Sequence, residues 1–181
     1  MQDKAIAARL AVAERIAVAG GELGLAYFRR VASLTVTSKG HQDMVSEADR
    51  DVETFLRGEI AKAFPDDAIL GEEHGLTTGR SGYTWVLDPI DGTANFVNAI
   101  PAWSVVVACV TDADTVVGVI HDPNVRETFA ASLGGGATLN GKPMRAAQGV
   151  SLTSGSVGVG LSNRVDWRPA VTFIHDLMAE G

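Results

Sequence analysis

The sequence has 181 residues, of which 46% are hydrophobic and 20% charged, with 22 acidic against 15 basic side chains. This length and hydrophobic content predict one folded domain, or one domain and part of a second, and exclude a disordered chain. The formal net charge of −7 argues against a nucleic-acid surface, which would need clustered Lys and Arg to meet the phosphates.

Two helices are predicted in the first third of the chain. The first covers residues 3–32, which are rich in Ala, Leu and Arg, and the second covers about residues 47–64. A short strand around residues 34–37 and a polar loop at residues 39–42 lie between them. The second helix carries its apolar residues on one face, namely Val52, Phe55, Leu56, Ile60, Ala63 and Phe64.

The pattern then changes to short β-branched runs separated by turn residues, which predict strands. These runs are residues 68–71, 83–87, 103–110, 115–121 and 127–132, followed by the hairpin signals Gly134–Gly136 and Asn140-Gly141. Two helices followed by a block of strands indicate an α+β fold.

The last part of the chain is predicted to begin a second domain. Residues 148–155 have the composition of a connection, residues 156–161 alternate as a strand, and residues 165–180 form a final helix. We therefore expect an α+β domain over residues 1–148, and the beginning of a second α/β domain over residues 149–181.

The cysteine and histidine residues are expected to be structural. The single cysteine, Cys109, lies in an apolar run and cannot form an internal disulfide. The four histidines, at positions 41, 74, 121 and 175, show no metal-binding spacing. Charged residues interrupt any signal-peptide segment, and the long uncharged stretches hold Pro, Gly and Asn, so we expect a cytoplasmic protein that neither enters a membrane nor binds nucleic acid.

The strongest chemical signal is a pair of carboxylates at the end of a strand. An apolar run delivers Asp88 at its carboxyl end, and Pro89 fixes the next φ so that the chain turns and Asp91 points back to the same side. Asp-Pro and Asp-Gly pairs are each common in ordinary turns. The combination of two acids with a glycine and a threonine after them is what indicates a site.

The residues around these acids add further oxygen and nitrogen groups. The Ile90 carbonyl is expected to be exposed, Gly92 permits a close approach or a positive φ, and Thr93 opens a short helical turn whose N–H groups face an anion. Hard oxygen donors at this density suit Mg²⁺, which keeps several waters and shares ligands with a substrate phosphate.

Two further acidic clusters stand at element boundaries upstream. Glu72 and Glu73 follow a strand, and Asp49 lies in the first turn of the second helix. For Glu73 and Glu47 we favour contact with solvent or a supporting role. Asp49 either complements the helix dipole or takes part in the site, and the spacing alone leaves both open.

Three motifs in this order resemble those of the inositol monophosphatase family of metal-dependent, lithium-sensitive sugar phosphatases. The motifs are Asp43-x-Val-Ser-x-x-Asp49, Gly71-Glu-Glu73 and Trp85-x-x-Asp-Pro-Ile-Asp-Gly-Thr-x-Asn-Phe96. The resemblance covers about residues 1–165. It implies an αβαβα layered sandwich, usually assembled as a homodimer, and two or three Mg²⁺ ions in each active site.

The resemblance also implies metal ligands. Glu72 and Asp88, with the Ile90 carbonyl, would hold the first Mg²⁺ beside the attacking water, and Asp88 with Asp91 would hold the second near the leaving oxygen. Lys39 would reach a water of a third, looser metal, with Glu73 in a supporting position.

The substrate contacts follow from the same resemblance. Gly92, Thr93 and the amide of Ala94 would hold the phosphate, and Asp91 would also reach a substrate hydroxyl. Asp49 would accept a hydrogen bond from Thr93, whose hydroxyl orients the attacking water and helps to deprotonate it.

One departure concerns the C-terminal half, which in the family carries a Trp-Asp motif whose aspartate completes the second metal site. Asp166-Trp167 has these letters reversed and is too early to replace it. We therefore expect either a piece of a longer enzyme or a short, impaired product. The 181-residue chain is expected to bind only the first Mg²⁺ well and to turn over phosphate esters feebly.

The function expected is Mg²⁺-dependent hydrolysis of a phosphate monoester, first of all myo-inositol 1-phosphate. Histidinol phosphate, fructose 1,6-bisphosphate and phosphoadenosine phosphate are rival substrates within the family. An alternative of another class is a non-catalytic binding or dimerisation module that has kept the motifs.

Overall fold

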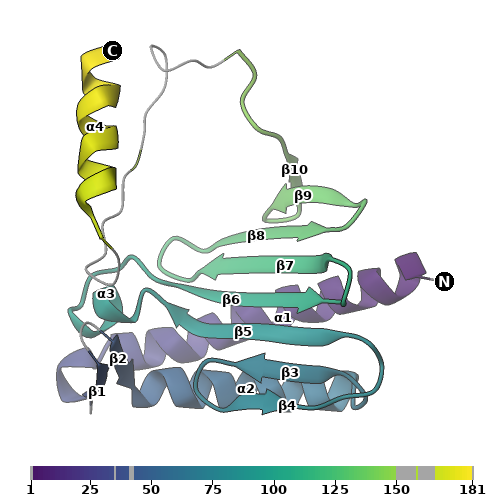
Figure 1. The fold of residues 1–181 in the computed structure, drawn as a ribbon. Helices are drawn as coiled ribbons and strands as arrows, with labels where there is room; N and C mark the ends of the chain where they lie inside the picture. Colours follow the sequence, from purple (N-terminus) through teal and green to yellow (C-terminus); the bar gives the residue numbers. More distant parts are fainter. Residues whose placement is uncertain (1, 35, 41–42, 150–157, 159–165, 181) are drawn as a thin grey trace.

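The computed structural model describes residues 2–34, 36–40, 43–149, 158 and 166–180, and only the backbone of residues 2–3, 36–40, 43–46 and 180. An eight-stranded sheet forms its centre, in the order β10-β9-β8-β7-β6-β5-β3-β4 (Figure 1). The pair β3 and β5 is parallel, and the other neighbours are antiparallel. The strands are β3 (Ala68–Gly71), β4 (Gly75–Thr77), β5 (Thr84–Asp91), β6 (Ser104–Val110), β7 (Thr115–Asp122), β8 (Glu127–Ser132), β9 (Gly136–Leu139) and β10 (Lys142–Met144).

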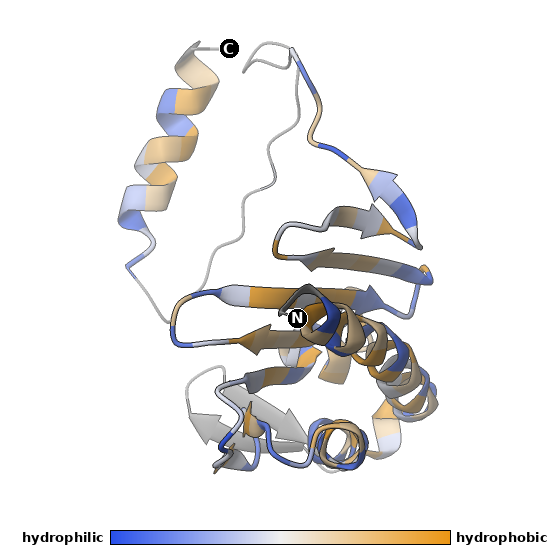
Figure 2. Ribbon diagram, turned by 90° about the vertical axis from the view of Figure 1, so that its right-hand side faces the viewer, coloured by the Kyte–Doolittle hydropathy of each residue, from blue (hydrophilic) through white to orange (hydrophobic). Residues whose placement is uncertain are grey.

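Two long helices cover one face of this sheet. Helices α1 (Gln2–Phe28) and α2 (Glu47–Ala63) pack against each other, while α4 (Arg168–Glu180) lies on the opposite side of the sheet (Figure 2). Between α1 and α2 the chain forms a 3₁₀ turn, η1 (Val31–Ser33), and a hairpin of β1 (Val36–Gly40) and β2 (Asp43–Ser46). The short helix α3 (Thr93–Val97) follows β5 directly.

The hydrophobic core lies between the helix pair and the sheet. Alternate residues of the central strands point toward the helices and are buried, since successive side chains of a strand face opposite sides. This set includes Trp85, Leu87, Val105, Val107, Cys109, Val117 and Val119 from the strands and Ile16, Val52, Leu56 and Ile60 from the helices. The opposite face of the sheet holds an apolar groove of about 410 Å³, lined by residues such as Val106, Ile120, Phe129 and Met144.

The predicted α+β class is confirmed, and most boundaries agree. Strands β3 and β8 have the predicted bounds, and α2 ends one residue before the predicted end. The first helix ends at Phe28 rather than at residue 32. Phe28 packs against Phe96 and Trp103, with ring centroids 5.3 and 5.8 Å apart, and the chain turns there into η1.

Three elements differ from the prediction. Much of the predicted polar loop at residues 39–42 belongs to the β1–β2 hairpin, and β4 was not foreseen because its three residues are too short to show a period. The final helix begins at Arg168, with Pro169 in its first turn as expected. The predicted strand at residues 156–161 lies outside the described residues apart from Gly158.

The predicted structural roles of Cys109 and of one histidine agree with their surroundings. Cys109 is fully buried, and burial raises the pKa of its thiol to about 12, so it carries no thiolate. His121 is buried, its Nδ1 lies 2.9 Å from the Thr128 hydroxyl oxygen, and burial lowers its pKa. No helix among the described residues has the length and apolar character needed to cross a membrane.

A buried ion pair joins the start of α1 to the sheet. Arg9 donates from Nε and Nη2 to the two carboxylate oxygens of Asp67, at 2.9 and 2.8 Å. Trp85 Nε1 and Ser81 Oγ donate to the same carboxylate at 2.9 and 2.6 Å. The Arg9 guanidinium also lies 3.6 Å from the centroid of the Tyr83 ring. Every oxygen of Asp67 thus has a partner, which is the condition for burying a charge.

Removing the charge at this position should destabilise the fold strongly. Asp67→Asn leaves the buried Arg9 without its counter-charge, and the expected loss is about 3–5 kcal/mol in the free energy of unfolding. The neighbouring Asp66 pairs with Arg80 at an exposed site, so Asp66→Asn should change it by less than about 0.5 kcal/mol. Urea unfolding of both variants measures the difference, and equal losses would contradict a special role for the Arg9–Asp67 pair.

Candidate active site

A β-bulge in β5 places two carboxylates on the same face of the sheet. Asp88 pairs with Val106 of β6, and the next paired residue, Asp91, pairs with Ser104. Three steps along β5 therefore match two steps along β6, so one extra residue is inserted into β5. Because Val106 and Ser104 lie on one face, Asp88 and Asp91 also share that face. The predicted convergence of the two acids is found, but a bulged strand rather than a turn after Pro89 produces it.

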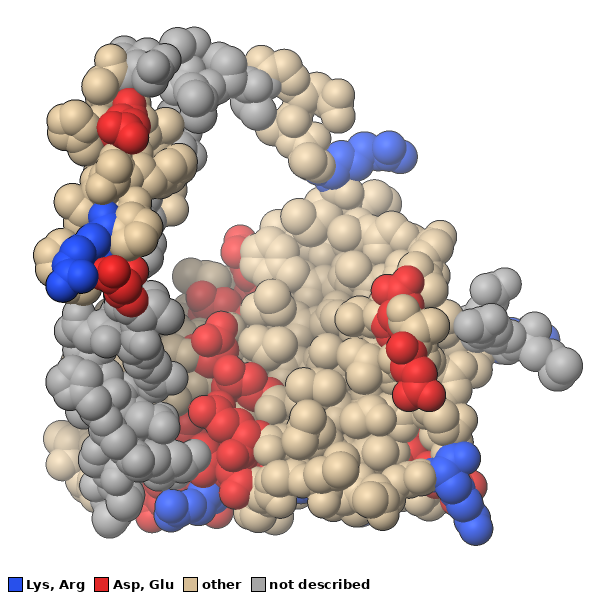
Figure 3. All heavy atoms as spheres, in the orientation of Figure 1, with Lys and Arg blue, Asp and Glu red and all other residues tan. Residues whose placement is uncertain are grey.

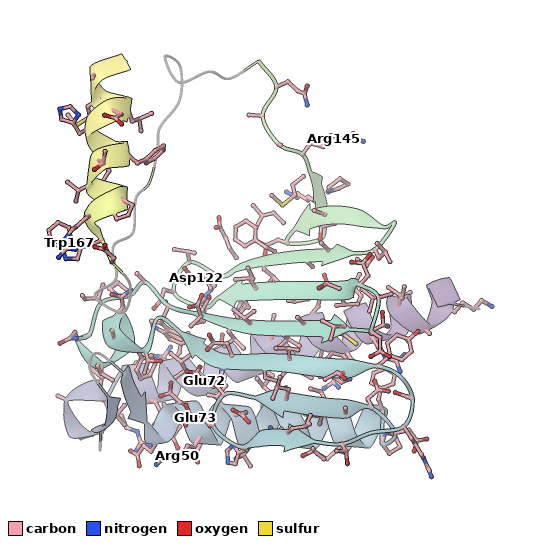
Figure 4. The ribbon with its side chains drawn as sticks, viewed as in Figure 1. Arg50, Glu72, Glu73, Asp122, Arg145 and Trp167 are labelled. Atoms are coloured by element: carbon pink, nitrogen blue, oxygen red, sulfur yellow. The ribbon has the colours of Figure 1, made fainter. Side chains whose placement is uncertain are left out.

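Glu72 reaches the same edge of the sheet from the neighbouring strand. Strands β3 and β5 are parallel, and Gly71 is in register with Leu87, so the residues that follow them, Glu72 and Asp88, lie side by side where β3 ends. Glu72 and Glu73 lie at this edge, close to β2 and α3 (Figure 4). The space-filling view shows acidic side chains gathered in a band beside a broad uncharged surface (Figure 3).

The charges of this cluster act strongly on Asp88. Burial, followed by the carboxylates of Glu72, Asp91 and Asp49, raises the pKa of Asp88 from its ordinary value to about 7. Its Oδ1 atom is buried and has no hydrogen-bond partner among the residues that the structure describes. A buried carboxylate oxygen without a donor is costly, and a cation beside it would remove the cost.

Thr93 joins the end of β5 to the start of α2. Its hydroxyl lies 3.1 Å from Oδ1 of the buried Asp49 and 3.0 Å from the Ile90 carbonyl oxygen, so its single proton can be donated to either acceptor. Gly92 precedes it with φ of 94°, and a Cβ there would lie 2.9 Å from the Ala102 carbonyl oxygen. Only glycine fits this positive φ and close approach, which sets the direction in which Thr93 and α3 leave the strand.

A second group of contacts ties α2 to the turn that carries Glu72. The carboxylate of Glu53, which is fully buried, accepts hydrogen bonds from the backbone N–H of Glu73 at 2.7 Å and of His74 at 3.2 Å. Arg57 Nε donates to the same carboxylate at 2.6 Å. Burial by itself would raise the pKa of Glu53, but these hydrogen bonds outweigh burial and hold it below its ordinary value.

The remaining predicted site residues are placed as follows. Ala94 is exposed at the start of α3, and Glu73 is partly buried in the turn after β3. Lys39 belongs to β1, but its side chain lies outside the described set, so its predicted contact with a metal-bound water is not tested.

Glu53 and His74 were missed by the sequence reasoning. The available signal was a glutamate at the buried face of α2, four residues after Asp49. His74 Nδ1 lies 3.2 Å from Glu53 Oε1. His74 therefore has the structural contact expected for it, although its partner was not foreseen.

The donor set of the cluster fits Mg²⁺. Asp88, Asp91 and Glu72 supply carboxylate oxygens, which Mg²⁺ prefers, and the buried Oδ1 of Asp88 has no hydrogen-bond partner among the described residues. In the same part of the chain, no group of three or more His, Cys, Asp or Glu side chains is placed so that it could hold a metal ion by itself, so waters and substrate oxygens would have to complete the coordination. An open set of this kind suits an ion that keeps waters and binds substrate oxygens.

Comparison with known proteins shows the family. The model of the inositol monophosphatase family matches residues 6–177, and the chain belongs to that family. It is 37% identical over 163 residues to the Nus factor SuhB of Pseudomonas aeruginosa, covering 87% of this chain and 60% of that protein. It is 39% identical over 136 residues to a histidinol-phosphatase of Chlorobaculum parvum, covering 75% of this chain and 52% of that one.

Solved structures of the family have the same fold. The extragenic suppressor protein SuhB of Bartonella henselae superposes with a TM-score of 0.76 at 34% identity, over 78% of this chain and 55% of that chain. An IMPase of Thermotoga maritima gives a TM-score of 0.70 at 34% identity, over 78% and 54%. The predicted sugar-phosphatase type of fold is thereby confirmed. The chain spans about half to three fifths of the length of these relatives.

Removing the charge of Asp88 should stabilise the metal-free protein at high pH. A group whose pKa is raised in the folded state contributes stability below about pH 4, and this contribution is lost as the pH rises to about 7. In chelator, the wild type should therefore be less stable than Asp88→Asn at about pH 8, by a few degrees in Tm, and the gap should close toward about pH 4.

The matched control is Asp112→Asn, in the exposed turn between β6 and β7. It should follow the wild type at every pH. Thermal melts across the pH range measure the effect. Parallel curves for the wild type and Asp88→Asn would show that Asp88 is not strained by its neighbours.

Proposed function

We propose that this site hydrolyses a phosphate monoester with the help of Mg²⁺, and that inositol 1-phosphate is the first substrate to test. The observation that carries the proposal is the meeting of Asp88, Asp91 and Glu72 at one sheet edge, where a buried oxygen of Asp88 has no partner in the described part of the chain. Membership of the inositol monophosphatase family supports it.

In this proposal Glu72, Asp88 and the Ile90 carbonyl hold the first ion, and Asp88 and Asp91 hold the second. When bound, the ions lower the pKa of a water, clamp the attacking and leaving oxygens, and neutralise charge on the phosphoryl group. Lys39 and Glu73 are assigned supporting positions around a third ion.

The chain's own residues orient the reacting groups. When Thr93 donates its proton to Asp49, the lone pairs of its hydroxyl oxygen become acceptors for a proton of the attacking water. Asp49 is buried and held in α2, so its acceptor oxygen has a fixed place beside the hydroxyl. Gly92, Thr93 and the amide of Ala94 hold the phosphate at the start of α3, and Asp91 reaches a hydroxyl of the substrate.

The names of the relatives refer to more than one phosphate ester. They include a histidinol-phosphatase, inositol-1-monophosphatases and an enzyme named both fructose-1,6-bisphosphatase and inositol-1-monophosphatase. The segment Thr93-Ala-Asn95-Phe96 resembles the inositol type most, whereas a basic residue after the threonine is commoner in some of the other types. Histidinol phosphate and fructose 1,6-bisphosphate are the alternatives, with phosphoadenosine phosphate as a third.

Several finer expectations belong to the same proposal. They are a homodimer in the cytoplasm, sensitivity to lithium, and a metal- and phosphate-binding domain over residues 1–148 followed by the start of a second domain. A module that binds ligand or dimerises without catalysis is the alternative of another class. Metal binding with no turnover of any substrate would favour it.

The proposal is tested by metal binding and hydrolysis in one experiment. Calorimetric titration of the chain with Mg²⁺ should show at least one bound ion, and release of phosphate should be measured for each of the four candidate substrates. Asp88→Asn should abolish Mg²⁺ binding and Mg²⁺-dependent turnover, because an amide brings one ligand oxygen and no charge. Turnover that persists in excess chelator, or in Asp88→Asn, would overturn the proposal.

The pairing of Thr93 with Asp49 predicts a distinctive kinetic effect. Thr93→Ala should lower kcat about 100-fold or more and change KM little, because orienting the water matters mainly in the transition state. Asp49→Asn should behave alike. The double variant should be no worse than the poorer single variant, whereas additive losses would show that the two residues act separately.

A further inference from the structure

Helix α2 presents three residues at helical spacing to the candidate site. Asp49, Glu53 and Arg57 are four residues apart in succession, so they lie along one face of the helix. Asp49 accepts from Thr93, Glu53 accepts from the turn after β3, and Arg57 donates to the Gly75 carbonyl and, at 3.0 Å, to the Thr77 hydroxyl. One rigid element therefore touches both strands that carry the acids.

The Glu53 contacts are directed at the backbone of the turn that holds Glu72. Its Oε2 accepts the N–H of Glu73 at 2.7 Å, and its Oε1 accepts the N–H of His74 at 3.2 Å. Glu73 N belongs to the peptide that links it to Glu72. A hydrogen bond to that peptide therefore fixes the backbone from which the Glu72 side chain leaves.

The fit between Glu53 and the turn leaves no spare room. A Cβ on Gly71, the residue just before Glu72, would lie 2.0 Å from Oε1 and 2.3 Å from the carboxyl carbon of Glu53. The φ of Gly71 is not positive, so its conformation alone does not require glycine. The space is reserved for the carboxylate, which explains why a glycine precedes the two glutamates.

Stability alone does not account for a buried acid at this place. A buried ion pair can often be replaced by apolar residues without loss of stability, and Glu53 adds one more negative charge behind an acidic cluster. What an apolar side chain could not do is accept two backbone N–H groups of the turn. The contact therefore serves to place the turn.

We propose that Glu53 is a positioning residue, whose buried carboxylate fixes the turn after β3 and thereby sets where the Glu72 carboxylate stands relative to Asp88 and Asp91. The inference rests on the proposed function, because Glu72 is taken as a metal ligand. Groups that orient a ligand in this way typically account for about 10–100-fold in metal affinity.

The test compares Glu53→Gln with Glu59→Gln in the 181-residue chain. Glutamine has nearly the same volume, but its amide NH₂ turns a donor toward one of the two N–H groups, so one hydrogen bond is lost. Glu59 lies on the same helix and, among the described residues, pairs with the exposed Arg15 and Lys62 side chains, which makes it the matched control. Mn²⁺ serves as the probe, because free Mn²⁺ is counted directly by electron paramagnetic resonance.

Glu53→Gln should weaken Mn²⁺ binding about 10-fold or more, and Glu59→Gln should leave it unchanged. Hydrogen exchange of the Glu73 and His74 amides in chelator should become faster in Glu53→Gln and stay unchanged in Glu59→Gln. Gly71→Ala is the second variant: its methyl group would occupy the place of the Glu53 carboxylate without removing the charge, so it should speed exchange of the same amides and weaken Mn²⁺ binding in the same direction.

The outcomes separate the inference from the proposed function. If Glu53→Gln and Gly71→Ala both bind Mn²⁺ with wild-type affinity and differ only by a lower Tm, Glu53 stabilises the fold but does not position the Glu72 carboxylate. A wild-type chain that binds no Mn²⁺ would contradict the proposed metal site and this inference with it. If Glu53→Gln does not fold, the Gly71→Ala result and the amide exchange of that variant decide alone.

Discussion

The mutual repulsion of carboxylates at one edge of the sheet is the constraint on which the rest of the structure depends. Glu72, Asp91 and Asp49 all act on Asp88, and burial makes their charges harder to screen. A fold that brings such groups together has to hold them by other contacts, because their own interaction pushes them apart. The surrounding elements are arranged to supply those contacts.

Backbone pairing supplies the first of them. The parallel register of β3 and β5 brings Glu72 beside Asp88, and the bulge against β6 brings Asp91 to the face of Asp88. Helix α2 supplies the second through side chains that reach each of these segments. Hydrogen bonds outside the cluster thus hold the carboxylates in place against their mutual repulsion. A cation bound between them would reduce that repulsion directly.

The sequence predicted the parts of the structure that depend on local pattern. The face of α2 made by Val52, Leu56 and Ile60, the strand β3 and the helical turn at Thr93 follow from periodicity and from turn residues. The contact between Thr93 and Asp49 came from the family resemblance, and the structure contains it. The role of Asp49 could not be assigned from spacing alone, since the helix dipole also favours an acidic residue in the first turn of a helix.

The features that the sequence could not predict depend on strand register and on buried polar contacts. The bulge in β5 is visible only when β6 is paired beside it, and β4 is too short to carry a period. In the sequence, Glu53 looks like any other charged residue of an amphipathic helix. Its contact with the turn after β3 is visible only in the structure. Long-range hydrogen bonds of this kind cannot be inferred from the residue composition.

The closeness of these residues along the chain has a consequence for how the site assembles. Glu53 and Glu73 are 20 residues apart, and Asp49 and Thr93 are 44 apart. Bringing the ends of a loop together costs entropy that grows only slowly, by about 0.6 kcal/mol for each doubling of its length. The acidic edge is therefore closed within one contiguous stretch of the chain that ends at Thr93, so all of its described oxygen donors are synthesised before the strands from β6 onward.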